Sequence, residues 1–235
     1  MLIYLDNSAT TAQRREVTET MLSAMENTYG NPSSLHRMGV EAEKLVKASR
    51  KAISASLGVS EDEIYFTSGG TESDNTAILG ACAALKRSGS HIITTAIEHP
   101  AVLECFRKLE SEGFSVTYLS PDRNGIVSAE KVRSALREDT ILVSVMHVNN
   151  ETGAIQPVEE IGALLSGREH TVFHCDAVQS FGKIPVPVRA AGIGALSASG
   201  HKIHGPKGVG ILFVDHNMRI VPYMIGGGQE RGLRS

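Results

Sequence analysis

Two short polar segments of the sequence contain residues well suited to chemistry. Lys202 lies in the run Ser199-Gly200-His201-Lys202, directly after an apolar stretch. A lysine that reacts as a neutral amine must be partly desolvated or lie beside other cations. Lys207 competes for this role, but it lies in a Gly-Pro-Lys-Gly turn where exposure is expected. We therefore predict Lys202 as the reactive amine, flanked by Ser199 and His201 as donors suited to a phosphate.

The second segment, Thr67-Ser68-Gly69-Gly70-Thr71, lies between a strand-like run and a helix-like run. Glycines let the backbone approach a ligand, and the free N–H groups at a helix N-terminus attract an anion. The segment lacks the Gly-Lys-Ser/Thr ending of a P-loop. Gly70 and Thr71 are predicted to hold a phosphate, although a tight turn with an ordinary helix cap would have the same composition.

Further polar residues follow other strand-like runs. Asp176 comes directly after one such run, where a carboxylate could pair with a protonated ring nitrogen, and Gln179 could donate to a ring oxygen. His99 could stack on a planar cofactor and carry protons near neutral pH. Asn150 adds an amide at the same edge. Asp176 could instead cap the following turn, and Asn149 and Asn150 could be turn formers.

One cofactor, pyridoxal phosphate (PLP), needs all of these groups together. A Rossmann enzyme would not need the lysine, and a metalloenzyme would need tighter clustering than nine scattered histidines offer, so no metal site is predicted. We predict that Lys202 holds PLP as a Schiff base and that His99 is the second catalytic residue. The predicted cofactor-binding residues are Gly70, Thr71, His99, Asn150, Asp176, Gln179, Ser199, Gly200, His201 and Lys202.

The elements that must position these residues alternate along the chain. Short apolar, β-branched runs predict strands at Ile64–Thr67, His91–Thr95, Ser115–Leu119, Ile141–Met146, Thr171–Cys175, Ala195–Ala198 and Val209–Val214. Amphipathic runs predict helices at Arg14–Asn27, Val40–Leu57, Ser73–Lys86, Ala101–Glu112, Ser128–Arg137 and Val158–Leu165. This alternation predicts an α/β fold, a three-layer α/β/α sandwich with a mainly parallel, about seven-stranded mixed sheet. Such sheets bind ligands beyond the carboxyl ends of their strands.

Composition excludes several classes of protein. The 235 residues suit one large or two small α/β domains, and the net charge of -3, from 23 basic and 26 acidic residues, gives no reason to expect nucleic acid or membrane surfaces as partners. The apolar runs are too short for a transmembrane helix, and the N-terminus lacks the pattern of a signal peptide. Cys82, Cys105 and Cys175 are widely spaced among apolar neighbours, which predicts buried thiols and a cytoplasmic, reducing compartment.

The sequence resembles the cysteine desulfurases of the nitrogen-fixation and iron–sulfur-cluster type, within the class-V aminotransferase-like, fold-type I PLP enzymes. The resemblance rests on Tyr4–Thr11, Gly30–His36, Thr67–Asn75, Glu98-His99, His147–Gly153, Asp176–Gly182, Ser199–Gly208 and Gly226–Ser235, which run in family order. It implies a homodimer that converts L-cysteine to L-alanine and passes an enzyme-bound persulfide sulfur to an iron–sulfur scaffold or sulfur-carrier protein. It also implies that Asn150 lies against the cofactor and the substrate carboxylate.

The chain departs from the family in length. The resemblance implies that residues 1–12 belong to a small domain, that residues 13–235 form the PLP-binding large domain, and that the C-terminal small domain, with the sulfur-accepting cysteine and a substrate-clamping arginine, is absent. His204 stands where this group usually has tyrosine. We therefore expect a cofactor-binding part that does not complete turnover. A selenocysteine lyase, another class-V PLP aminotransferase, and a non-catalytic dimerisation or scaffold-binding fragment are the alternatives.

Overall fold

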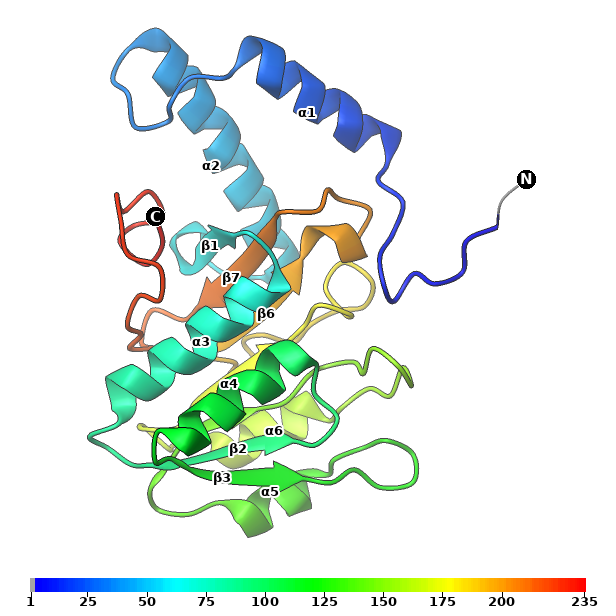
Figure 1. Cartoon of the computed structure of the whole chain (residues 1–235), viewed down its shortest axis with the longest axis vertical. Coiled ribbons are helices and arrows are strands. Elements are labelled where there is room, and N and C mark those ends of the chain that lie inside the picture. The colour runs from blue at the N-terminus through cyan, green and yellow to red at the C-terminus, as the bar shows by residue number, and fades with distance from the viewer. Residues whose placement is uncertain (1–2) are drawn as a thin grey trace.

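The centre of the computed structural model, which describes residues 3–235, is a seven-stranded mixed sheet (Figure 1). Its strands are β1 (Ile64–Thr67), β2 (His91–Thr95), β3 (Ser115–Leu119), β4 (Thr140–Ser144), β5 (Val172–Asp176), β6 (Ala195–Ser199) and β7 (Gly210–Val214). Their order across the sheet is β1-β7-β6-β5-β4-β2-β3. Only β7 runs antiparallel to its neighbours β1 and β6, so the predicted mainly parallel sheet is confirmed.

Helices cover both faces of this sheet. They are α1 (Arg15–Asn27), α2 (Arg37–Leu57), α3 (Gly70–Leu85), α4 (Pro100–Ser111), α5 (Ala129–Ala135) and α6 (Val158–Leu165), with short 3-10 helices η1 (Glu61–Glu63) and η2 (Gly200–Lys202). Apolar side chains of α3 and α4 pack on one face, and those of α5, α6 and the end of α2 pack on the other. The predicted three-layer α/β/α sandwich is therefore confirmed.

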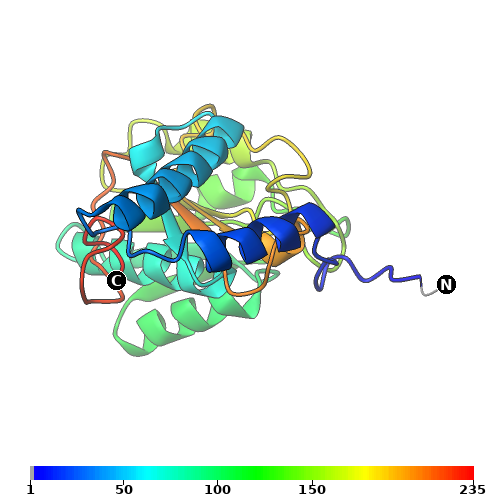
Figure 2. The same ribbon diagram turned by 90° about the horizontal axis from the view of Figure 1, so that it is seen from above.

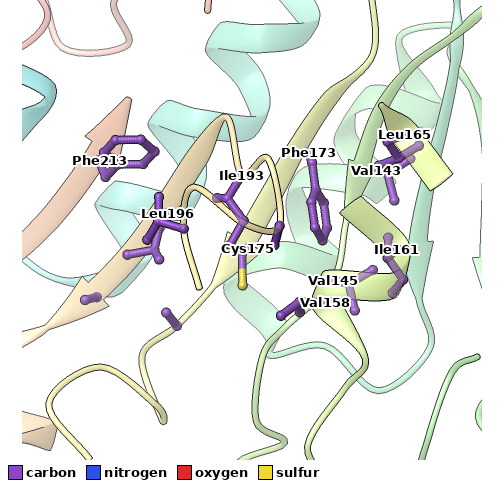
Figure 3. Close-up of a cluster of buried hydrophobic side chains, with 14 of the residues drawn as sticks. Val143, Val145, Val158, Ile161, Leu165, Phe173, Cys175, Ile193, Leu196 and Phe213 are labelled. Atoms are coloured by element: carbon purple, nitrogen blue, oxygen red, sulfur yellow. The ribbon is translucent and has the colours of Figure 1, made fainter. Parts of the chain in front are cut away.

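The larger apolar cluster lies between the sheet and α6 (Figure 3). Val143 and Phe173 come from neighbouring strands, and Ile161 and Leu165 come from α6 one helical turn apart. Parallel strands covered on both faces are buried continuously rather than at alternate positions, and β2, β4 and β6 are buried at every position. This core holds the strand ends at fixed positions along one edge.

Two segments lie outside the sandwich. Helix α1 has no buried residue and stands apart from the layers (Figure 1, Figure 2). The last ten residues form an irregular loop, which is held by an ion pair of 3.0 Å between Arg50 and Glu230 and by one of 2.7 Å between Arg234 and Glu72. Glu230 also accepts the backbone N–H of Phe66, so this loop covers the outer edge of β1.

Several predicted boundaries were wrong by a few residues. Helix α3 begins at Gly70 rather than Ser73, because the glycine segment itself forms the first helical turn. Helix α5 begins after Ser128, whose side chain caps it, and ends at Ala135 rather than Arg137 because Leu136 takes an extended backbone. None of the helices within residues 3–235 combines the length and the apolar character that a membrane crossing requires.

Candidate functional site

A cavity of about 530 Å³ opens at the carboxyl-end edge of the sheet. All of the predicted cofactor-binding residues except Gly200 line it, namely Gly70, Thr71, His99, Asn150, Asp176, Gln179, Ser199, His201 and Lys202. They follow β1, β2, β4, β5 and β6, strands that run in one direction and therefore end at the same edge. The volume is in the range of small-molecule sites.

Gly200 takes no part in the cavity wall. Its backbone N–H donates to Val209 O at 3.0 Å, and a side chain added there would lie 2.8 Å from the Val209 Cγ1 methyl. Glycine is needed at this position because Val209 packs directly against the backbone. The residue shapes the turn that carries Lys202 and lies behind the cavity.

Lys202 is partly buried and lines the cavity, whereas Lys207 is exposed and does not. The Lys202 ammonium donates to the backbone oxygens of Ser8 and, at 2.9 Å, Ala9. Burial lowers the pKa of Lys202, and the positive charge of Lys183 lowers it further. Both effects favour the neutral amine that a nucleophilic lysine requires.

A second donor reaches the same acceptor as Lys202. The Gln179 amide Nε2 donates to the Ser8 backbone oxygen at 2.8 Å. Because the Lys202 amine and the Gln179 amide contact the same oxygen, the two groups lie close together in the cavity. Such a pair suits a ligand in which an electron-rich ring oxygen lies next to a carbon that can bond to an amine. This arrangement fits PLP, whose ring oxygen and aldehyde carbon are adjacent.

Asp176 is 5% exposed and ends β5 at the floor of the cavity. Its Oδ1 accepts the Val178 backbone N–H at 2.8 Å, so it caps the following turn and also faces the cavity. The two roles that the sequence left open for Asp176, capping a turn and facing a ligand, are therefore compatible. Burial raises the pKa of Asp176, while the Val178 N–H and the charges of His99 and Lys202 act in the opposite direction. A protonated ring nitrogen is a suitable partner for such a buried carboxylate.

Two more acidic residues lie near Asp176, and sequence reasoning missed both. Asp74 lines the cavity at 1% exposure, and its Oδ1 has no hydrogen-bond partner within residues 3–235, with His174 Nε2 at 3.5 Å. Burial raises the pKa of Asp74 well above its ordinary value, and the charge of Asp176 raises it further. Burial raises the pKa of Glu98 to about 8. On α3, Asp74 lies between the buried residues Ser73 and Thr76. The helical periodicity of α3 could therefore have placed Asp74 on the buried side of the helix.

The predicted phosphate loop lies at the N-terminus of α3. Gly70 packs against Val178, whose Cγ2 would lie 2.8 Å from an added side chain. Thr71 and Ser199 line the cavity beside it, and His201 Nδ1 is hydrogen-bonded to Thr10 Oγ1 at 3.0 Å. Free N–H groups of a 16-residue helix, together with these polar side chains, suit an anion such as the phosphate of PLP.

His99 and Asn150 complete the predicted set. His99 is the N-cap of α4, and its Nδ1 accepts the Ala101 N–H at 3.1 Å, so the neutral ring carries its proton on Nε2. Asn149, rather than Asn150, is the turn former, because its Oδ1 accepts the Thr152 N–H at 2.8 Å. Asn150 lines the cavity instead, which separates the roles of these two neighbours.

The N-terminal segment forms a wall that the strand-end reasoning missed. Ser8 and Ala9 line the cavity, and Thr11 is hydrogen-bonded to the backbone of His201 and His204. The remaining lining residues that were missed are Met146, Val148, Glu151 and Val178. The run Tyr4–Thr11 carries part of the family resemblance, and that was the available signal for this wall.

The three cysteines of the described residues do not line the cavity. Within residues 3–235 there is no group of three or more histidine, cysteine, aspartate or glutamate side chains placed to hold a metal ion. Cys82, Cys105 and Cys175 are buried free thiols, as predicted. Burial raises the pKa of both Cys82 and Cys105 to about 12, and that of Cys175 well above its ordinary value.

Comparison with known proteins gives concordant matches. The family model described as aminotransferase class-V matches residues 3–233. The cysteine desulfurase IscS of Methanosarcina thermophila is 49% identical over 234 residues, which are 99% of this chain and 57% of that protein. A solved NifS-like protein superposes with a TM-score of 0.97 at 44% identity, covering 100% of this chain and 65% of that one. SspA, solved in complex with cysteine, superposes with a TM-score of 0.94 at 42% identity, covering 100% and 68%. The chain spans 57–61% of the length of the curated relatives it matches.

Proposed function

The chain belongs to the class-V aminotransferase family, and from that premise we propose that it is the cofactor-binding part of a PLP-dependent cysteine desulfurase. The observation that carries the proposal is the convergence of Lys202 Nζ and Gln179 Nε2 on one acceptor inside a cavity that ends at buried Asp176. The names of relatives near 50% identity support the choice of reaction within the family.

Each lining residue that the sequence predicted has a role in this proposal. Lys202 holds the cofactor covalently, Asp176 pairs with its ring nitrogen, and Gln179 donates to its ring oxygen. The phosphate is held by Gly70, Thr71, Ser199 and His201. PLP, when bound, supplies an electron sink for bonds broken at the substrate Cα.

The chain's own groups would move the proton and orient the substrate. His99 would stack on the cofactor ring. Its Nδ1 is occupied by the Ala101 N–H, which leaves Nε2 as the atom that exchanges a proton with the substrate. Asn150 lines the same cavity as Lys202, and its amide would take the substrate carboxylate.

The substrate proposed for the whole protein is L-cysteine, in keeping with the solved relative that holds cysteine. The reaction yields L-alanine and a persulfide on an enzyme thiol, and the sulfur passes to an iron–sulfur scaffold or a sulfur carrier. The accepting thiol is not one of the three buried cysteines described above, so residues 3–235 do not complete turnover alone.

Organisation and location follow the same proposal. Residues 13–235 form the PLP-binding large domain, and residues 1–12 belong with a small domain while also supplying the Ser8 wall. The protein acts as a homodimer. A reducing, cytoplasmic location is consistent with three thiols that are unpaired and buried.

A covalent test of Lys202 decides the proposal. The purified chain mixed with PLP should develop a visible absorbance band, and reduction with borohydride followed by peptide mass spectrometry should place the cofactor on Lys202. Lys202→Ala should abolish both signals, since Lys202 is the one lysine among residues 3–235 that lines the cavity.

Lys207→Ala is the matched control, because Lys207 lies five residues away and is exposed. It should retain the band. The proposal would be wrong if the unmodified chain developed no band, or if the cofactor remained attached in Lys202→Ala.

A further inference from the structure

Gln179 is held from two sides, one of which lies outside the cavity. Its Nε2 donates to the Ser8 oxygen at 2.8 Å, and its Oε1 accepts from Lys183 Nζ at 3.2 Å. Lys183 does not line the cavity. Gly182, with a φ of +72°, turns the backbone between them, and the Lys183 N–H donates to Ser180 O at 2.9 Å. This turn brings the lysine back to the amide four residues before it.

A primary amide has one acceptor end and one donor end, whereas an ammonium group only donates. The contact with Lys183 is therefore compatible with a single orientation of the Gln179 amide, in which Oε1 faces the lysine and Nε2 faces the cavity. The opposite orientation would set amide N–H groups against the ammonium and present an oxygen to the cavity. An oxygen there would repel an electron-rich ring oxygen instead of binding it.

We propose that Lys183 is a positioning residue that fixes the Gln179 amide with its N–H directed at the ring oxygen of the bound cofactor. This inference rests on the proposed function, because it assigns the acceptor to PLP. Lys183 is an exposed residue whose ammonium lies 3.2 Å from Gln179 Oε1, and partial burial lowers its pKa. Its charge also acts on Lys202. The lysine therefore has two possible routes of influence, through Gln179 or directly through its charge.

A double-mutant cycle separates the two routes. The dissociation constant of PLP is measured by absorbance titration for the unmodified chain, Lys183→Met, Gln179→Ala and the double variant. Loss of a hydrogen bond of this kind corresponds to a severalfold change in affinity. Lys183→Met should weaken binding about fivefold and Gln179→Ala about tenfold. The double variant should bind no more than about twofold more weakly than Gln179→Ala, because contacting residues that act as a unit are not additive.

Three further variants sharpen the test. Lys183→Arg should restore binding to within about twofold, because a guanidinium also only donates. Gln179→Glu should keep the Lys183 contact and still weaken binding, because it removes the donor. Lys51→Met, at an exposed lysine on α2, should leave the dissociation constant unchanged. Urea midpoints of the Lys183 variants should equal that of the unmodified chain, which a structural role would not allow.

The outcomes that overturn the inference differ from those that overturn the proposed function. Additive losses in the double variant, or unchanged binding in Lys183→Met, would show that Lys183 does not act through Gln179. Absence of saturable PLP binding in the unmodified chain would overturn the proposed function and this inference with it.

Discussion

Several ionisable side chains are buried near Asp176. His174 Nδ1 is hydrogen-bonded to Ser144 Oγ at 2.8 Å, and its Nε2 to Ser197 Oγ at 3.1 Å. Burial lowers the pKa of His174 to about 3, so the ring is neutral and serves both hydroxyls, with one nitrogen as donor and the other as acceptor. With Glu98 also held neutral, Asp176 is the group best placed to carry the negative charge that faces a cofactor ring.

Glu98 makes folding stability depend on pH in a defined direction. Its pKa rises from 4.5 to about 8 on burial, so the folded chain binds a proton that the unfolded chain releases between these values. Stability from this group is fully present below the unfolded pKa and is lost as pH rises through the folded pKa. From about pH 6 to about pH 8 we expect Glu98→Gln to become more stable than the unmodified chain by about 1.4 kcal/mol per pH unit.

Urea unfolding of both cofactor-free chains at several pH values measures this difference. A glutamine retains the oxygen that accepts from Thr95 Oγ1 and the Met146 N–H. Glu138→Gln, at an exposed site, is the control and should leave the pH profile unchanged. Parallel profiles for Glu98→Gln and the unmodified chain would mean that Glu98 is ionised in the fold.

Residue types at the strand ends could be predicted from the sequence because chemistry restricts them. Asp176, Lys202 and Gln179 follow apolar runs. They supply a carboxylate, an amine and an amide, a combination that few kinds of binding site need. The separation of Asn149 from Asn150 could not be predicted, because both residue types tolerate turns. The contacts that distinguish Asn149, with the Thr152 N–H and with Ile97 O, are visible only in the fold. The Ser8 oxygen could not be predicted either, since a backbone atom gives no sequence pattern.

At the scale of elements, the phosphate loop depends on a strand far along the chain. Gly210 begins β7 and pairs with both Thr67 and Ser199. A side chain added at Gly210 would lie 2.5 Å from the Gly69 carbonyl carbon, which is backbone and cannot move aside cheaply. The closeness of these two glycines places the N-terminus of α3 beside the end of β6.

Gly210→Ala should therefore displace the phosphate loop. We expect PLP binding to be at least about tenfold weaker, because the displaced segment is the one proposed to hold the phosphate, and a lower thermal unfolding midpoint, because overpacking a core destabilises it. Gly194→Ala is the matched control, since a side chain there would meet its nearest atom at 3.5 Å, an ordinary contact. Equal PLP affinity in the two variants would contradict this account.

Element positions could be predicted better than element boundaries. The strands Ile64–Thr67, His91–Thr95 and Ser115–Leu119 match the predicted bounds because turn-forming residues flank short apolar runs. The start of α3 lies before the predicted start because Gly70, Thr71 and Glu72, which form its first turn, are not apolar. The periodicity of apolar residues cannot locate a helical turn that contains no apolar residue.

At the scale of the whole molecule, the three thiols are inaccessible. A thiol reagent should find no reactive cysteine in the folded chain and three after denaturation, because Cys82, Cys105 and Cys175 are buried and burial raises each pKa. With added PLP and L-cysteine, the chain should give no sustained sulfide release beyond that of Lys202→Ala. Rapid thiol labelling of the folded chain, or sulfide release that depends on Lys202, would contradict the prediction.

The sheet class could be predicted, but the order of its strands could not. Right-handed crossovers account for the parallel strands β2 to β6. The insertion of β7 between β1 and β6 depends on the connection His201–Val209 and on pairing with a strand near residue 65, a long-range contact that local patterns do not contain.

That insertion has a consequence for the order of events during synthesis. β1 pairs with no strand except β7 in the sheet formed by residues 3–235, so it has no partner until residues 210–214 have been made. At roughly 5–20 residues per second, the wait is on the order of ten seconds or more. During that time β2, β3, β4, β5 and β6 are made one after another and can begin to pair, while the phosphate loop that follows β1 stays unfixed. A nascent chain should therefore acquire its capacity for PLP only after Val214 has left the ribosome exit tunnel.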